Sequence, residues 1–282
     1  MAEPRIEIGG GDIDVQMSGA SETPVSEVEI PGGPEGEADA TAAEPTEEAA
    51  PDSQDEVFIN YLKSPIVELV VGKGDDQTIL TAHQAVLTTS PFFHEVVALF
   101  DEAGPRRIVL EDESTDAVGA FLQFQYTGEY FPRRLPSSAD GLETDPSIPE
   151  TDDTGDQLLR HARVYTLAEK FQLSNLKSLA HSKIHRINST ARGEIAYARY
   201  VYANTAADDA TIRKPVAAFW ATRSHVLRHE AENEFKSMCL EFPQFGFDIL
   251  SLVLDQKEKR SERGPETPTV KGSARKRARM GL

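Results

Sequence analysis

The chain of 282 residues carries a net charge of −18 at pH 7, and this charge is distributed unevenly. Residues 1–55 contain 15 acidic residues and one basic residue, whereas residues 255–282 contain nine basic and four acidic residues. The only cysteine, Cys239, excludes an intramolecular disulfide and any zinc site that needs several cysteines. The chain also lacks an apolar run of about 20 residues, the length that spans a bilayer, so we expect no membrane partner.

The N-terminal residues lack the basic start and the apolar stretch of a secretory signal. A chain with one cysteine also fits a reducing compartment. We therefore expect the protein in the nucleus, the cytoplasm or both.

Both ends of the chain are predicted to be disordered. Residues 1–55 are rich in Glu, Ala, Gly, Pro and Ser, so they cannot bury enough apolar surface to offset the entropy lost on ordering. Such an acidic tail is either an interaction segment or, more commonly, a solubilising leader. The basic segment 256–282 has a similar lack of apolar periodicity.

Three short strands are predicted in the central part. The runs 66–71 and 78–83 are rich in apolar and β-branched residues, and the glycines and aspartates between them predict a hairpin turn. A third strand is predicted at 107–110.

Helices are predicted around and after these strands. The helical pattern over 84–100 is interrupted at Pro91, where Ser90 is suited to cap a new helix. Another helix is predicted to begin at Ser114 and to stop at Gly128.

The remainder of the chain is predicted to be helical after an insert. Residues 132–156 are acidic and proline-containing, which predicts a flexible insert. Two helices joined by a tight turn are predicted over 158–187, followed by a helical extension over 187–255. In that extension Pro215 is expected in the first turn of a helix, where proline is tolerated.

Several blocks between Asn60 and Lys183 resemble the BTB/POZ domain, and they occur in the order expected for that family. The opening of the domain and the acidic insert are most similar to the fungal members. The predicted domain covers residues 56–186. The blocks are 67–72, 82–87, 90–93, 108–112, 120–128 and 164–171.

The resemblance implies an α+β fold: the BTB/POZ fold, a small mixed sheet flanked by helices, followed here by a helical C-terminal extension. It also implies a protein-interaction module without catalytic residues, so we predict no enzymatic activity, no cofactor and no small-molecule substrate. Members of the family bind other copies of themselves, transcriptional corepressors, or the cullin scaffold of ubiquitin ligases.

Two positions depart from the pattern of the dimeric repressor-type members. Those members usually have a buried Asp in the first strand and a basic residue after the Ala-His pair, where this chain has Ile66 and Gln84. The resemblance therefore makes corepressor binding less expected, and a monomeric or weakly dimeric domain is plausible.

A candidate partner-binding site is Phe100-Asp101-Glu102. Cullin adaptors of the family often have a hydrophobic residue, then any residue, then Glu, just before the third strand. An apolar anchor fills a pocket while a carboxylate fixes the orientation at its rim. The alternative, slightly favoured on the sequence alone, is that Phe100 ends the core face of its helix and the two acids are simply solvated.

Histidine pairs and the basic tail offer other chemistry. His181/His185 and His225/His229 have the i,i+4 spacing of metal ligands, but their neighbours are cationic, so we predict no metal site. Arg275, Lys276, Arg277 and Arg279 form a candidate nuclear-import cluster, although a basic tail can also contact acidic segments or nucleic acid nonspecifically. No module for sequence-specific binding of nucleic acid is recognisable.

Two functions remain open from the sequence. The first is a protein-binding substrate adaptor for a cullin-based ubiquitin ligase. The second is a nuclear regulatory or scaffold protein that self-associates through its BTB domain.

Overall fold

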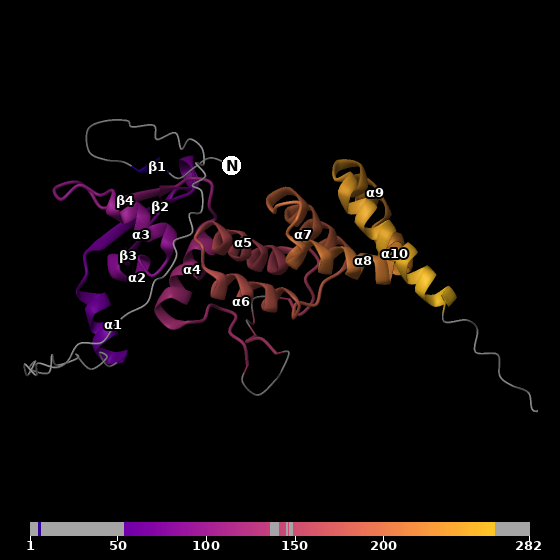
Figure 1. Cartoon of the computed structure of the whole chain (residues 1–282), viewed down its shortest axis with the longest axis horizontal. Coiled ribbons are helices and arrows are strands. Elements are labelled where there is room, and N and C mark those ends of the chain that lie inside the picture. The colour runs from indigo at the N-terminus through magenta and orange to yellow at the C-terminus, as the bar shows by residue number, and fades with distance from the viewer. Residues whose placement is uncertain (1–4, 7–53, 136–140, 145, 147–148, 263–282) are drawn as a thin grey trace, which may run out of the picture. The chain divides into compact units, whose positions relative to one another are not determined.

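The computed structural model describes residues 5–6, 54–135, 141–144, 146 and 149–262 (Figure 1). The chain divides into two compact units: unit 1 consists of residues 1–130 and 170–173, and unit 2 of residues 131–169 and 174–282. Within the described residues, no single helix has the length and hydropathy to cross a membrane. Two consecutive helices bent by 110° at their junction pass that test together, by length and composition alone.

Unit 1 is built on a mixed sheet with the strand order β1-β4-β2-β3. β2 (Ile66–Val71) and β3 (Thr78–His83) form an antiparallel hairpin, and β4 (Arg107–Leu110) lies parallel to β2 on its other side. The three predicted strands are therefore confirmed. The short strand β1 (Arg5–Ile6), which the sequence did not predict, pairs antiparallel with β4; residues 1–4 and 7–53 lie outside the described part of the chain.

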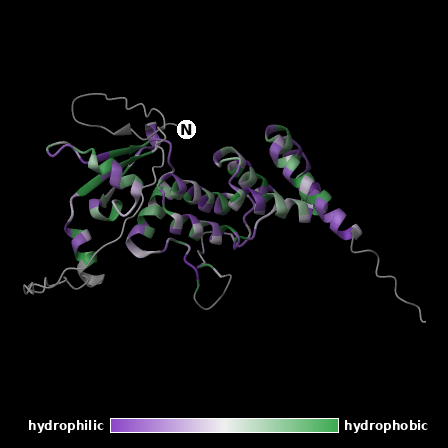
Figure 2. Cartoon of the chain, viewed as in Figure 1, coloured by the Kyte–Doolittle hydropathy of each residue, from purple (hydrophilic) through white to green (hydrophobic). Residues whose placement is uncertain are grey.

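β2 lies inside the sheet, between β4 and β3, and one of its faces is fully covered. Val67, Leu69 and Val71 are fully buried, and the intervening Val70 is nearly so. The other face is covered only toward the end of the strand, because Glu68 is partly buried and Ile66 is 50% exposed. In Figure 2 the strands of unit 1 are correspondingly coloured as hydrophobic.

The backbone conformation of the hairpin turn explains why glycine stands at positions 72 and 74. Gly72 and Gly74 have φ values of 86° and 60°, a region that side chains disfavour. A Cβ atom on Gly72 would also lie 3.0 Å from the backbone oxygen of Asp76. The predicted turn is confirmed, and it includes a short 3₁₀ helix at Gly74–Asp76.

Four helices complete the part of unit 1 that the structure describes. Pro91, at the first position of its helix, separates the second helix from the third as predicted, because proline lacks an N–H but fits a first turn. The last of the four ends at Gly128, which adopts the left-handed conformation with φ 73°. The helices are α1 (Gln54–Lys63), α2 (Gln84–Leu87), α3 (Pro91–Ala98) and α4 (Thr115–Thr127).

Unit 2 is helical throughout its regular elements. Trp220, Phe235 and Phe245 form its largest aromatic cluster, with ring centroids 5.4–6.0 Å apart, and α8 packs against both α7 and α10. The helices are α5 (Asp156–Lys170), α6 (Ser174–Ile184), α7 (Ala191–Asn204), α8 (Ala210–Glu230), α9 (Glu232–Glu241) and α10 (Pro243–Glu262).

Part of the predicted flexible insert is built into unit 2. The buried side chain of Asp152 accepts hydrogen bonds from the backbone N–H groups of Gly155 (2.8 Å) and Leu158 (3.1 Å) at the start of α5. Asp152 also pairs with Ser189 through the backbone. The end of the insert therefore caps a helix, while residues 136–140, 145 and 147–148 lie outside the described residues.

Pro215 is not in the first turn, which corrects the prediction. α8 begins at Ala210, so the proline lies inside the helix. Without an N–H, Pro215 leaves the carbonyl of Thr211 without its helical hydrogen bond. Nε2 of His181 lies 3.0 Å from that carbonyl oxygen, which can only accept, so the imidazole donates the missing hydrogen bond.

The end of the helical region also differs from the prediction. α10 continues to Glu262, past the expected boundary at residue 255. From residue 254 to residue 261 every residue of this helix is exposed, so the polar sequence there is compatible with a solvated helix as well as with disorder.

Candidate protein interaction surface

A buried serine fixes the start of α3. The hydroxyl of Ser90 donates a hydrogen bond to the carbonyl oxygen of Phe171 at 2.7 Å and accepts one from the N–H of Phe93 at 3.5 Å. Ser90 is fully buried, so both bonds are protected from water. The predicted cap is confirmed, and it also ties α3 to a residue 81 positions later in the chain.

Four phenylalanines form an aromatic cluster at α3, two of them (Phe92 and Phe93) from the helix itself. Phe93 and Phe121 stack with centroids 5.3 Å apart, and the ring of Phe171 lies within 5.0 Å of each of them and of Phe92. Aromatic pairs at these separations add to the stability supplied by burial. The helix therefore stands on a rigid platform within unit 1.

The predicted partner-binding residues lie in the turn that follows α3. Phe100 is partly exposed and its N–H donates to the carbonyl of Val97 at 3.1 Å, while Asp101 and Glu102 are exposed. Neither carboxylate hydrogen-bonds or ion-pairs through its side chain with another described residue. Leu99, which the sequence analysis passed over, is 55% exposed beside them. The turn thus presents two apolar side chains next to two free acids.

Strand β3 forms the other candidate surface of unit 1. It lies at the edge of the described sheet, and Ile79 on this strand is 56% exposed. An edge strand leaves one row of backbone N–H and C=O groups available for pairing. The sequence predicted the strand but not its edge position, because strand order depends on contacts distant in sequence.

The remaining charges of unit 1 are mostly paired. Arg107 donates from Nε and Nη2 to one carboxylate oxygen of Glu68, its neighbour across the sheet, at 3.0 and 2.8 Å. At the hairpin turn, the hydrogen bond and the negative charge of Asp112 raise the pKa of Lys73. Asp101 and Glu102 have no such partner among the described residues, and the same holds for Glu95 and Asp116.

A comparison with known families identifies a domain that includes the sheet strands β2, β3 and β4 of unit 1. Residues 67–144 match the family model described as the BTB/POZ domain. The chain contains a BTB/POZ domain. Such a domain is a protein–protein interaction module and is generally without enzymatic activity. A search of the curated proteins found no match to the chain.

The BTB domain has the predicted architecture. Its small mixed sheet is flanked by helices and followed by a helical C-terminal region, so the predicted fold class is confirmed. The division into units nevertheless differs from the predicted boundaries, because α5 and α6 belong mainly to unit 2.

His83 has a structural role in the BTB domain, as expected for a residue at a strand–helix junction. The hydroxyl of Tyr126 accepts a hydrogen bond from the N–H of His83 at 3.0 Å and forms a second one with Nδ1 at 2.7 Å. The Tyr-Thr-Gly sequence at the end of α4 therefore fixes the end of β3.

The two positions that depart from the repressor-type pattern are not linked as a charge pair. Ile66 is 50% exposed at the start of β2, and the side-chain oxygen of Gln84 accepts a hydrogen bond from Arg106. Neither residue can supply a buried charge.

The sites outside the BTB domain have separate outcomes. The basic cluster at Arg275, Lys276, Arg277 and Arg279 lies outside the described residues. No group of three or more potential metal ligands occurs in the part of the chain that the structure describes. Nε2 of His181 and Nε2 of His185 do lie 3.2 Å apart, a proximity that the i,i+4 spacing predicted.

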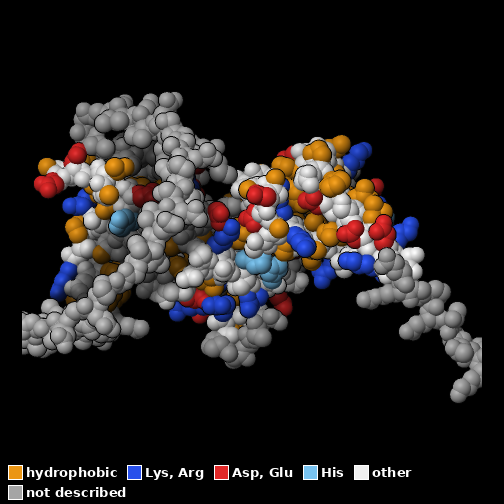
Figure 3. Space-filling view, in the orientation of Figure 1, with side chains coloured by type: hydrophobic (Ala, Val, Ile, Leu, Met, Phe, Trp, Pro, Cys, Tyr) orange, Lys and Arg blue, Asp and Glu red, His pale blue; other side chains and the backbone are white. Residues whose placement is uncertain are grey.

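Unit 2 carries an apolar surface of its own. On the face shown in Figure 3, hydrophobic side chains gather over α8, α9 and α10. Leu240 is 73% exposed and Phe247 is 63% exposed. The exposed fraction is lower for three other apolar side chains of these helices, Val226, Leu250 and Leu254.

Proposed function

We propose that this chain is a substrate adaptor of a cullin-based ubiquitin ligase, of the kind found among fungal BTB proteins. In this proposal the BTB domain docks on the cullin and unit 2 recruits a target. The observation that carries it is the turn after α3, where Leu99 and Phe100 offer apolar anchors beside the unpaired carboxylates of Asp101 and Glu102. Exposed aromatic anchors with a polar rim are typical of interface hot spots.

The anchoring of α3 supports the same proposal. Ser90 holds the start of the helix and Phe93 packs in the phenylalanine cluster, so the helix that leads into the turn is fixed in unit 1. Preorganised residues lose less entropy on binding and so contribute more affinity.

The test is binding of the full chain to the N-terminal half of a cullin from the same organism, by size exclusion with light scattering and by calorimetry. We expect a stoichiometric complex that Phe100→Ala weakens by about 30-fold, the loss of a 2 kcal/mol hot spot. The control is Phe58→Ala, which removes a phenylalanine that is 44% exposed on α1. Equal affinity of the Phe100→Ala variant and the unmodified chain would remove this site from consideration.

The second candidate is a nuclear scaffold that self-associates through its BTB domain. The exposed edge strand β3 with Ile79 favours it, because two such edges can pair. It predicts a dimer in light scattering without added cullin, and a strict monomer at high concentration contradicts it. Nuclear import would then depend on Arg275, Lys276, Arg277 and Arg279, and their replacement by alanine would retain a fluorescent fusion in the cytoplasm.

A further inference from the structure

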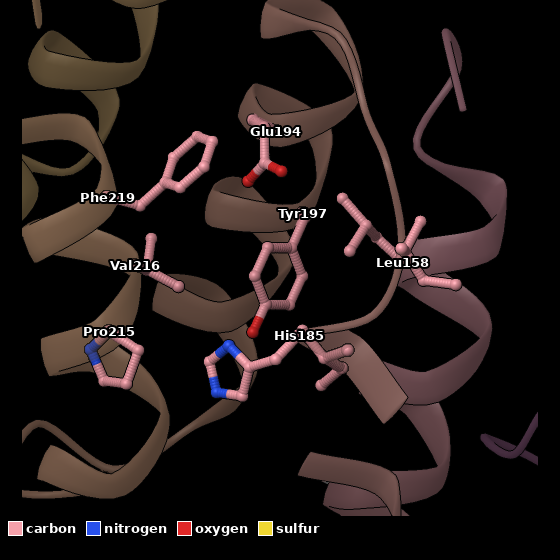
Figure 4. Close-up of a pocket in the computed structure, with 9 residues that line it drawn as sticks. Leu158, His185, Glu194, Tyr197, Pro215, Val216 and Phe219 are labelled. Atoms are coloured by element: carbon pink, nitrogen blue, oxygen red, sulfur yellow. The ribbon is translucent and has the colours of Figure 1, made fainter. Parts of the chain in front are cut away.

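Unit 2 contains a pocket that the interaction surfaces described above do not include. Its volume is about 100 Å³, and it opens between the start of α5, the end of α6, α7 and α8 (Figure 4). The walls are mostly apolar. The lining residues are Leu158, Ile184, His185, Ile187, Glu194, Tyr197, Pro215, Val216 and Phe219.

Two buried polar side chains of α7 face this pocket. Glu194 is 8% exposed and Tyr197 is 5% exposed. Neither side chain hydrogen-bonds or ion-pairs with any other described residue. Most buried polar groups in proteins have a hydrogen-bonding partner. Two unpaired groups that line one cavity therefore indicate a site where a polar ligand can add hydrogen bonds that favour its binding.

The pocket offers hydrogen-bond acceptors rather than fixed donors. Glu194 supplies carboxylate oxygens at one end, and in Figure 4 the ring of Tyr197 extends from there toward His185, with its hydroxyl beside the imidazole. Burial and the nearby charges of His181 and Arg186 lower the pKa of His185, so this ring, at the rim, is neutral at pH 7 and has an acceptor nitrogen.

Charges around Glu194 act in opposite directions. Burial raises the pKa of its carboxyl to about 7, the guanidinium of Arg223 opposes that rise, and the carboxylate of Asp152 adds to it. Arg223 is exposed and lies over the ring of Phe219, 4.4 Å from its centroid, so solvent screens its charge. The strongest electrostatic attraction for a cation inside the pocket would therefore come from the poorly hydrated carboxylate of Glu194.

We propose that this pocket binds a primary alkylammonium group, with the ammonium at Glu194 and the hydrocarbon chain against Leu158, Val216 and Phe219. An ammonium has three N–H donors and no acceptor, which complements a site built from acceptors. A cavity of roughly 150 Å³ accommodates benzene, so this one holds roughly four non-hydrogen atoms. That is the size of the end of a lysine side chain or of a short free amine.

The proposal does not depend on the cullin hypothesis, because every residue of the pocket belongs to unit 2. Failure of cullin binding therefore leaves it untouched, and its own failure leaves the BTB surface untouched.

The test compares n-butylamine with n-butanol, which has the same chain but no charge. The full chain, labelled at the methyl groups of Ile, Leu and Val, is titrated with each compound at pH 8 and followed by NMR. We expect butylamine, at millimolar concentration, to shift the methyl signals of Leu158, Ile184, Ile187 and Val216, while butanol leaves them in place. Equal shifts with butanol, or no shifts with either compound, overturn the proposal.

Two further arms keep the test decisive. Glu194→Gln keeps the shape of the side chain and removes its charge, and we expect about tenfold weaker binding of butylamine. Glu230→Gln, the same change on an exposed residue of α8, should leave the affinity unchanged. If Glu194→Gln fails to fold, the role of Glu194 can still be tested on the unmodified chain by measuring its affinity for butylamine at two pH values. Protonation of Glu194 should weaken that binding about tenfold between pH 8 and pH 6. Affinity that does not change over that pH range overturns the role of Glu194.

The source of the ammonium is resolved by a third compound, N-acetyl-lysine methylamide. Binding of this compound at the same methyl groups supports the proposal with a lysine of a protein partner as the ligand. Binding of butylamine alone supports it with a free amine as the ligand.

Discussion

Replacing Ser90 by alanine should destabilise unit 1 by about 2–3 kcal/mol. The substitution removes the donor to the carbonyl of Phe171, a bond of 2.7 Å inside the protein. A buried acceptor that loses its donor costs about 1–3 kcal/mol. The longer cap bond to the N–H of Phe93, at 3.5 Å, adds about 0.5 kcal/mol, the low end of the range for a lost cap.

Ser114 provides a matched control for this prediction. It stands at the same N-cap position, at the start of α4, but its side chain makes no capping hydrogen bond. Ser114→Ala should therefore change the free energy of unfolding by no more than about 0.5 kcal/mol. The comparison separates the two hydrogen bonds of Ser90 from any general effect of removing a serine before a helix.

The measurement is urea unfolding of the full chain, with each unit followed by its own probe. Methyl NMR signals of Leu69 and Ile108 report on unit 1, and the fluorescence of Trp220 reports on unit 2. Ser90→Ala should lower the midpoint of the methyl transition and leave the fluorescence transition unchanged. Equal effects of the Ser90 and Ser114 substitutions would refute the reasoning.

Three further outcomes are expected from other contacts. Gly193→Ala should destabilise unit 2 by about 1–3 kcal/mol in urea unfolding, because the new Cβ would lie 2.6 Å from the backbone oxygen of Asp152. Tyr126→Phe should cost about 1–2 kcal/mol and increase amide hydrogen exchange at His83, which loses both bonds to the hydroxyl. Burial raises the pKa of Glu194 from 4.5 to about 7, so the folded chain keeps a proton that the unfolded chain releases. The free energy of unfolding should therefore fall by up to about 3 kcal/mol as the pH rises from 4.5 to 7, and Glu194→Gln should abolish that slope in urea titrations followed by tryptophan fluorescence.

The elements of unit 1 from β2 to α4 could be predicted because their signals are local, whereas β1 and α1 were not predicted. The β-branched run over Ile66–Val71, the turn glycines, the Ser90-Pro91 cap and the stop at Gly128 each determine the conformation within a few residues. The candidate site Phe100-Asp101-Glu102 came from the resemblance to cullin adaptors and stays a prediction; the structure places it between α3 and β4 and adds the exposed Leu99 beside it. That addition needed the exposure of Leu99, which depends on which face of α3 the core covers.

Other features depend on contacts that no local pattern records. Pro215 is tolerated inside α8 because a histidine from α6 satisfies the Thr211 carbonyl, and nothing in the sequence near Pro215 reveals that donor. The pocket was missed for the same reason: Glu194 reads as an ordinary polar residue of a helix, and only packing against α5, α6 and α8 leaves it buried and unpaired. The sequence accordingly predicted no small-molecule site.

Because Phe171 belongs to unit 1 but comes late in the sequence, the core of unit 1 cannot be completed until the ribosome has added this residue. A ribosome completes residue 130 about 40 residues before it adds Phe171, the ring that contacts Phe92, Phe93 and Phe121. At roughly 5–20 residues per second, the emerging unit waits about two to eight seconds with that side of its core open. During this interval the nascent chain presents an aromatic surface to which chaperones can bind, and the first-made unit matures only after residues 131–169 of the second have been translated.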